Sequence, residues 1–307
     1  MSSTDNINNN IITCAACGKE GVGDHMNMCN KCKAVKYCNA ACKKRHRKTH
    51  KKKCEIWAAE LHEVELFKDP SPPDDCQICF QPLPFDPNQT IFRTCCGKLI
   101  CLGCTGGMLE DAFMKRKKEE ELAICPFCRA PHARTNKEEI KRYKNLMEND
   151  NADAYFYLAG AYADGLRGLT PDRQKANELY LKAGELGCAG AYFNLGNAYD
   201  NGRGVEVDEE KAKYYWELSA MGGDVGARYN LGYTELQAGN IQRAVKHFMI
   251  SARAGDVDSL DSVKSAFRDG IITKDEYEDT LRSYHKYQVE IKSDMRDKAA
   301  AIVNNRL

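Results

Sequence analysis

The clearest hydrophobic pattern lies in the second half of the chain, where small and aromatic residues recur at i, i+3, i+4 and i+7. DAYFYLAGAYADG at 153–165 aligns with GAYFNLGNAYDNG at 190–202, and GARYNLGYTELQAG at 226–239 follows at a similar offset. This spacing puts the apolar residues on one helix face, and such a period is typical of a helical repeat array. We expect a second helix in each unit, beginning after Asp172 or Asp208, because aspartate is a favoured N-cap residue.

The first half of the chain has only short apolar stretches between charged residues. Residues 54–67 carry a helical stripe, and the prolines and aspartates of 69–75 then predict a linker. Residues 137–148 predict a charged helix that leads into the repeats. No run approaches the ~18 to 20 apolar residues that a spanning helix needs, so we expect no membrane association.

Composition adds few constraints. The 307 residues include 45 Lys and Arg against 44 Asp and Glu, a net charge of +1 that argues against nucleic acid as the partner. The first 13 residues are polar and rich in asparagine, with neither the basic nor the apolar part of a secretory signal. We therefore expect a disordered lead-in and an intracellular protein, in the cytoplasm, the nucleus or both.

The cysteines carry most of the chemical information. Fifteen of the sixteen fall between Cys14 and Cys128, and Cys188, expected to be a buried small residue, stands alone. Without a secretory signal, repeated C-x2-C pairs indicate metal ligands rather than disulfides. Five such pairs occur: Cys14/Cys17, Cys29/Cys32, Cys76/Cys79, Cys101/Cys104 and Cys125/Cys128.

The first cysteine-rich segment, residues 14–54, offers seven cysteines and His50, enough ligands for two tetrahedral zinc ions. The segment is too short and too rich in lysine to build an apolar core. Zinc is therefore expected to supply most of its folding free energy, of the order of 10 kcal/mol per site.

This ligand order, with Tyr37 inside it, resembles the MYND zinc finger. The resemblance implies one zinc ion on Cys14, Cys17, Cys38 and Cys42, and another on Cys29, Cys32, His50 and Cys54. The distance of His46 from Cys54 does not fit the H-x3-C ending, so we expect His46 to be a surface residue. MYND fingers usually bind proline-containing peptides through a glutamine and a tryptophan, where this chain has Lys43 and Arg47. Both belong to a basic run at 43–53, which is either a solvated helix face, a nuclear localisation signal or a patch for an acidic partner or nucleic acid.

A second set of eight cysteines, in the order CQIC, CCGKLICLGC and CPFCR, resembles an all-cysteine RING finger, with Lys98 at the position of the usual histidine. The resemblance implies one zinc ion on Cys76, Cys79, Cys101 and Cys104, and another on Cys95, Cys96, Cys125 and Cys128. RING ligases bind a ubiquitin-conjugating enzyme at positions that match Ile78, Pro126 and Arg129 here, with Met108 or Leu109 as a helix contact. Full zinc shells leave no site for an activated water, so we expect no catalytic side chain and an activity, if any, that rests on scaffolding.

The repeats resemble Sel-1-like repeats, a class related to tetratricopeptide repeats. The second unit carries the GxGV loop of the family at Gly202, Gly204 and Val205, and the third unit lacks it. A degenerate fourth unit is expected near Ser259, with helical capping from Lys274 onward. The resemblance implies a concave surface that binds proteins, with most aromatic residues in the core.

Together these patterns predict a mainly α protein: two small zinc-stabilised modules, MYND and RING, followed by an α-helical solenoid of Sel-1-like repeats. The expected domains are 1–13 disordered, 14–54 MYND, 55–75 helix and linker, 76–129 RING, 130–150 connector helix, 151–285 solenoid and 286–307 C-terminal cap. The order of modules resembles proteins known chiefly as predicted sequences from diatoms and related algae.

The leading hypothesis for function is a RING-type ubiquitin-protein ligase that holds four zinc ions, two per finger. Its RING recruits the charged ubiquitin-conjugating enzyme, and its repeats or MYND finger recruit the substrate. The alternative is a non-enzymatic, zinc-dependent adaptor, with a nuclear location as one option, in which all modules only bind proteins.

Overall fold

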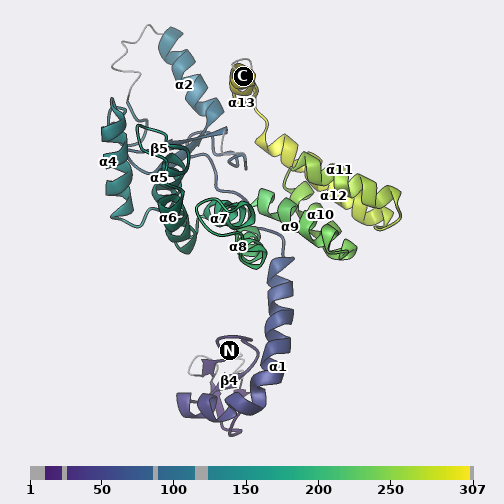
Figure 1. Ribbon diagram of the computed structural model, residues 1–307. Coiled ribbons are helices and arrows are strands. Elements are labelled where there is room, and N and C mark those ends of the chain that lie inside the picture. Colours follow the sequence, from purple (N-terminus) through teal and green to yellow (C-terminus); the bar gives the residue numbers. More distant parts are fainter. Residues whose placement is uncertain (1–10, 23–25, 86–88, 115–123, 305–307) are drawn as a thin grey trace, which may run out of the picture. The chain divides into compact units, whose positions relative to one another are not determined.

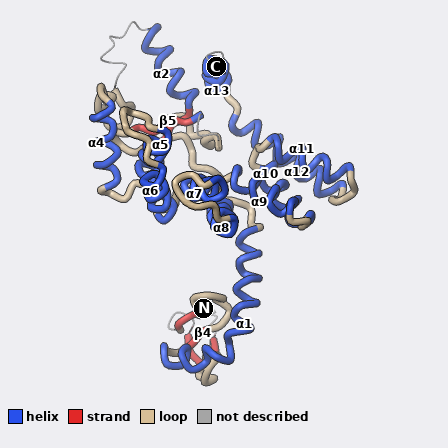
Figure 2. The backbone as a smooth tube through the Cα atoms, in the orientation of Figure 1, coloured by secondary structure: helices blue, strands red, loops and turns tan. Residues whose placement is uncertain are grey.

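The computed structural model describes residues 11–22, 26–85, 89–114 and 124–304, and it is mainly helical, as predicted (Figures 1 and 2). The chain divides into two compact units between Lys68 and Asp69. Among the described helices, none is long and apolar enough to cross a membrane.

The N-terminal unit consists of two short hairpins and one long helix. Strands β1 (Ile11–Thr13) and β2 (Glu20–Val22) pair antiparallel, as do β3 (Asn27–Met28) and β4 (Lys36–Tyr37). Residues 1–10 of the expected disordered lead-in lie outside the described residues, whereas residues 11–13 form a strand, so that expectation was wrong for these three.

Helix α1 spans Ala40–Leu66, and its N-cap is Asn39, whose side chain accepts a hydrogen bond from the Cys42 N–H at 2.8 Å. Because residues 40–66 contain no proline or glycine, nothing interrupts the helix. The basic run and the apolar stripe, which the sequence presented as separate features, therefore lie on one element.

The second unit begins with the other cysteine-rich segment. Strands β5 (Thr90–Arg93) and β6 (Lys98–Cys101) form an antiparallel hairpin, and helix α2 (Leu102–Met114) follows directly. The C-terminal helix α13 (Asp294–Asn304) packs against α2, although the two are far apart in the sequence (Figure 1).

The rest of the unit is a helical array that follows α4 (Asn136–Met147). Neighbouring helices pack as antiparallel pairs: α5 (Ala152–Asp164) with α6 (Arg173–Glu185), α7 (Ala189–Asn201) with α8 (Glu209–Met221), α9 (Val225–Gln237) with α10 (Ile241–Arg253), and α11 (Val257–Arg268) with α12 (Lys274–Ile291). The predicted N-caps are confirmed, because Asp172 and Asp208 each accept a backbone N–H at 3.0 Å.

Small residues let the paired helices approach closely. A methyl group on Gly196 would lie 2.3 Å from the Trp216 ring, so only glycine fits there. Trp216 is buried and donates its indole N–H to Asn197 at 3.1 Å. Aromatic residues thus fill the spaces between helices, as expected, and Cys188 packs among them.

The cysteine-rich segment of the second unit shares a core with the first helices of the array. Phe92 of β5 stacks on Tyr157 and Tyr143, with ring centroids 4.7 Å and 6.0 Å apart. Leu158 and Ala154, both buried, belong to the same cluster. This segment is therefore anchored to the array rather than tethered to it by a linker.

Candidate metal centres

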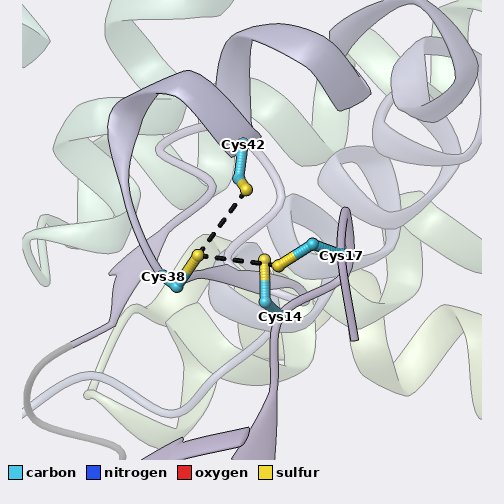
Figure 3. A group of neighbouring side chains, drawn as sticks. All are labelled: Cys14, Cys17, Cys38 and Cys42. Atoms are coloured by element: carbon cyan, nitrogen blue, oxygen red, sulfur yellow. Dashed lines mark hydrogen bonds between the residues drawn. The ribbon is translucent and has the colours of Figure 1, made fainter. Parts of the chain in front are cut away.

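The structure gathers the metal-binding candidates into four groups of four, and in each group the ligand atoms lie within 4.8 Å of one another. Their members are Cys14, Cys17, Cys38 and Cys42 (Figure 3); Cys29, Cys32, His50 and Cys54; Cys76, Cys79, Cys101 and Cys104; and Cys95, Cys96, Cys125 and Cys128. These are the four sets that the MYND and RING resemblances implied.

The sulfur spacings suit tetrahedral zinc. Four thiolates bound at 2.3 Å would lie roughly 3.8 Å apart. Measured Sγ–Sγ separations are 3.7 Å for Cys17–Cys38, 3.8 Å for Cys76–Cys104 and 3.7 Å for Cys96–Cys125. In the mixed group, the Cys32 sulfur lies 3.4 Å from Nε2 of His50.

Each group contains one turn of the same backbone geometry. The residue after the second cysteine of the C-x2-C pair has a positive φ, and its N–H donates to the carbonyl oxygen of the first cysteine at 2.8–3.1 Å. The four residues in this position are Gly18, Lys33, Phe80 and Arg129. A positive φ costs free energy in a residue other than glycine, so the turns at Lys33, Phe80 and Arg129 are strained.

Backbone N–H groups, from the turn itself and from other segments of the chain, also point at the first cysteine of two of these turns. The Cys38 N–H lowers the pKa of the Cys14 thiol to about 6. Burial alone would raise the pKa of Cys76, but the N–H groups of Cys101 and Cys79 outweigh it and lower the pKa to about 7. A lowered pKa favours the thiolate, which is the form that binds zinc.

Other cysteines in the same groups shift the opposite way. The side chain of Cys42 raises the pKa of Cys38 to about 12, and burial together with Cys29 raises the pKa of Cys54 to about 11. Thiolates this close repel one another, so without a cation only some can ionise. A divalent metal removes the repulsion, and its binding releases the remaining protons.

His46 is not the surface residue that the sequence suggested. It is half-buried, lies 3.2 Å from the Tyr37 hydroxyl through Nδ1, and stacks on His50 with centroids 5.5 Å apart. It therefore supports the orientation of His50, the imidazole that belongs to a cysteine group.

Positively charged side chains, all but one of them from α1, line a hollow of about 910 Å³ beside the second group. We call it the basic groove; its cations are Lys31, Lys43, Lys44, Arg47, Lys48 and Lys51. Residues 43, 47 and 51 are spaced by one helical turn and share a face. Lys43 also donates to the Asn30 side chain at 2.7 Å and to the Met28 carbonyl at 3.1 Å.

In the second unit, the residues matched to a conjugating-enzyme site come from two loops and a helix. Ile78 and Met108 are half-buried and pack in one cluster with Phe127, the residue after Pro126. Arg129 is exposed beside the fourth group. Phe80, which the sequence did not single out, is 77% exposed on the first loop.

A buried arginine that the sequence did not single out lies at the third group. Arg296 of α13 is 7% exposed and places Nη2 3.6 Å from the Cys79 sulfur. No local spacing could have revealed this contact, because the two residues are 217 positions apart. Arg45 also lies near a cysteine sulfur, with Nη2 3.9 Å from Sγ of Cys42, but it is exposed and only three residues away on the same helix.

The fold and the sites define a zinc-finger protein with an α-helical repeat array. Family models confirm both parts: a MYND finger matches residues 14–54, and Sel1 repeats match 152–188, 189–224 and 225–256. Neither match covers residues 76–129, where the evidence for metal binding is the geometry of the two cysteine groups. A MYND finger with cysteine and histidine groups indicates zinc binding, and Sel1 repeats indicate binding to other proteins.

Curated relatives match only part of this chain. The chain is 39% identical over 62 residues to putative sel1-like repeat-containing protein L21 of Acanthamoeba polyphaga mimivirus, which is 20% of this chain and 12% of that one. It is 31% identical over 111 residues to ERAD-associated E3 ubiquitin-protein ligase component HRD3B of Arabidopsis thaliana, 36% of this chain and 17% of that one. The matched segments thus span less than a fifth of either relative.

Among solved structures, a Sel1 repeat protein from Oxalobacter formigenes aligns with a TM-score of 0.41 at 26% identity. The alignment covers 53% of this chain and 64% of that one.

Proposed function

We propose that the chain binds four zinc ions, one in each cysteine group, and that residues 76–129 act as a RING-type ubiquitin-ligase module. The carrying observation is that two cysteine groups interleave along the chain, and that the half-buried Ile78 and Met108 pack with Phe127, next to the half-buried Pro126. Bound zinc would fix the two loops on either side of α2, so that the apolar side chains could hold a conjugating enzyme. The full ligand sets give zinc a structural role only.

In this proposal Arg129 has a separate task from the apolar residues. Its exposed guanidinium extends from the last cysteine turn, where it can donate hydrogen bonds to the conjugating enzyme and to ubiquitin at once. Such bonds immobilise the charged thioester, and a substrate lysine then attacks it. The similarity to a ligase component from Arabidopsis supports a setting of this kind, and the Sel1 repeats would bring the substrate.

The test is single-turnover discharge of ubiquitin from a charged conjugating enzyme onto free lysine. Arg129→Ala removes charge-assisted hydrogen bonds of about 1.5 to 3 kcal/mol. Discharge should slow by roughly tenfold to a hundredfold, since 1.36 kcal/mol is a decade in rate. Arg134→Ala, which removes another exposed arginine nearby, is the matched control and should match wild type. If Arg129→Ala also matches wild type, the role of Arg129 is refuted.

The second candidate function is a protein-binding adaptor without ligase activity, which the MYND and Sel1 matches favour because both families bind proteins. Failure of the wild-type protein to accelerate discharge with any member of a broad enzyme panel would decide for the adaptor.

A further inference from the structure

Helix α13 fits a glycine face on α2. A methyl group on Gly103 would lie 2.7 Å from the backbone nitrogen and Cγ of Arg296, and one on Gly107 would lie 2.7 Å from Sδ of Met295. Residues 103, 106 and 107 have the spacing of a single helix face. Glycine weakens a helix relative to alanine, so the three glycines lower the stability of α2. The close packing of α13 against them offsets this loss.

Arg296 uses that close approach to reach the loop after Cys79. Its Nη1 donates to the carbonyl oxygen of Pro82 at 2.8 Å and to that of Ile291 at 2.9 Å. Its Nη2 lies 3.4 Å from the carbonyl oxygen of Gln81 and 3.6 Å from the Cys79 sulfur. One buried guanidinium therefore ties a candidate zinc ligand and two carbonyl oxygens of its loop to the end of the chain.

The same loop is held a second time from the C-terminal side. The Phe85 N–H donates to the Tyr287 hydroxyl of α12 at 3.4 Å, and the two rings stack with centroids 5.5 Å apart. Residues 79–85 thus rest on α12 and α13 over most of their length.

The positive charge of Arg296 is stabilising if zinc is bound at the third group. A zinc ion with four thiolates carries a net charge of −2, which a neighbouring guanidinium partly compensates. A buried arginine beside neutral thiols would be left without that compensation, at a large desolvation cost. Outer partners of this kind typically change metal affinity by 10- to 100-fold.

We propose that α13 is a latch on the second zinc module, in which Arg296 retains zinc at the Cys76–Cys79–Cys101–Cys104 site from the far end of the chain. The inference rests on the proposed zinc site. Because the coupling is reciprocal, undocking α13 weakens the binding of this zinc ion by the same factor by which loss of the ion weakens the docking of α13.

The experiment uses the full-length, zinc-loaded protein and two measurements. A chromogenic chelator reports zinc release, and mass spectrometry reports the rate at which a maleimide alkylates Cys79. Arg296→Gln should speed release of one zinc ion and alkylation of Cys79 by about 10- to 100-fold. Arg282→Gln, in which the replaced arginine side chain is 68% exposed on α12, should behave like wild type.

A glycine pair on α2 gives a second test that does not remove a charge. Gly103→Ala strengthens α2 as an isolated helix but drives a methyl group into the backbone of α13. It should speed zinc release as Arg296→Gln does. Gly106→Ala is the matched control, because its methyl group would lie 3.7 Å from the Ala299 Cβ in ordinary contact. Wild-type release in both Arg296→Gln and Gly103→Ala overturns the latch.

Cys76→Ser separates this inference from the zinc site beneath it. If Cys76→Ser holds as much zinc as wild type, the proposed site has failed, and the latch with it. If Cys76→Ser loses one ion and Arg296→Gln releases zinc at the wild-type rate, only the latch fails. Hydrogen exchange tests the effect of zinc loss on α13. Chelation should raise the exchange of residues 294–304 and leave residues 241–253 protected. Unchanged exchange over 294–304 would contradict the reciprocal coupling.

Discussion

Acid should destabilise the repeat array through one histidine. His247 of α10 is fully buried, and burial, together with the positive charges of Arg228, Arg243 and Lys213, lowers its pKa to about 3 against the opposing effect of Glu235. The unfolded chain takes up the proton near pH 6.5, whereas the folded chain does not. The stability contributed by neutral His247 is therefore complete above pH 6.5 and is lost as pH falls. Between about pH 7.5 and pH 5.0 the loss amounts to about 2 kcal/mol.

The assay is urea unfolding in saturating zinc, followed by circular dichroism at both pH values for wild type and His247→Gln. Both proteins carry the same cysteine groups, so the difference between them removes the pH dependence of zinc binding. His247→Gln should lose about 2 kcal/mol less than wild type over this interval. His285→Gln, which replaces an exposed histidine, should keep the full wild-type dependence. Equal losses in wild type and His247→Gln would show that His247 does not cause the loss of stability in acid.

Three further predictions concern the cysteine groups and the basic groove. Native mass spectrometry should find four zinc ions per chain, and a fully loaded sample with two or fewer would show that one pair of groups is misassigned. Chelation should leave most helical circular dichroism intact, because α4–α12 contain none of the four groups, and loss of nearly all helix would contradict this. The basic groove should bind acidic peptides, with affinity falling steeply as salt rises, and should bind proline-leucine peptides weakly. Arg47→Glu should abolish the binding of acidic peptides. Tight, salt-insensitive binding of an apolar proline-rich peptide would contradict the prediction that the basic groove prefers acidic peptides.

Local spacing made much of this molecule predictable. The helical array follows from apolar residues at i, i+3, i+4 and i+7, and its helix starts follow from aspartates such as Asp172. The members of the four cysteine groups could be predicted because the order of ligands along the chain, compared with that of MYND and RING fingers, assigns each cysteine to a group. Spacing also suggested a surface role for His46, which was wrong because Tyr37 and His50 pack around it.

Contacts between distant segments were not predictable from one sequence. Phe92 is one apolar residue in a short strand, and only the fold places it against Tyr143 and Tyr157. Arg296 sits in a charged C-terminal segment, where a solvated helix is the ordinary interpretation. Its burial depends on the glycines of α2. Nothing in the sequence around Arg296 points to these glycines, and nothing around the glycines points to Arg296.

The second cysteine-rich segment touches both ends of the repeat array: Phe92 packs on residues of α4 and α5, and α2 packs on α13. An open array gains or loses whole repeats readily, because each repeat contacts only its neighbours. Here, an inserted helix pair between α6 and α11 would carry α13 away from Gly103 by the translation and rotation of a full repeat. The array therefore has a fixed length, and divergence among natural variants is expected in surface residues and loops rather than in the number of repeats.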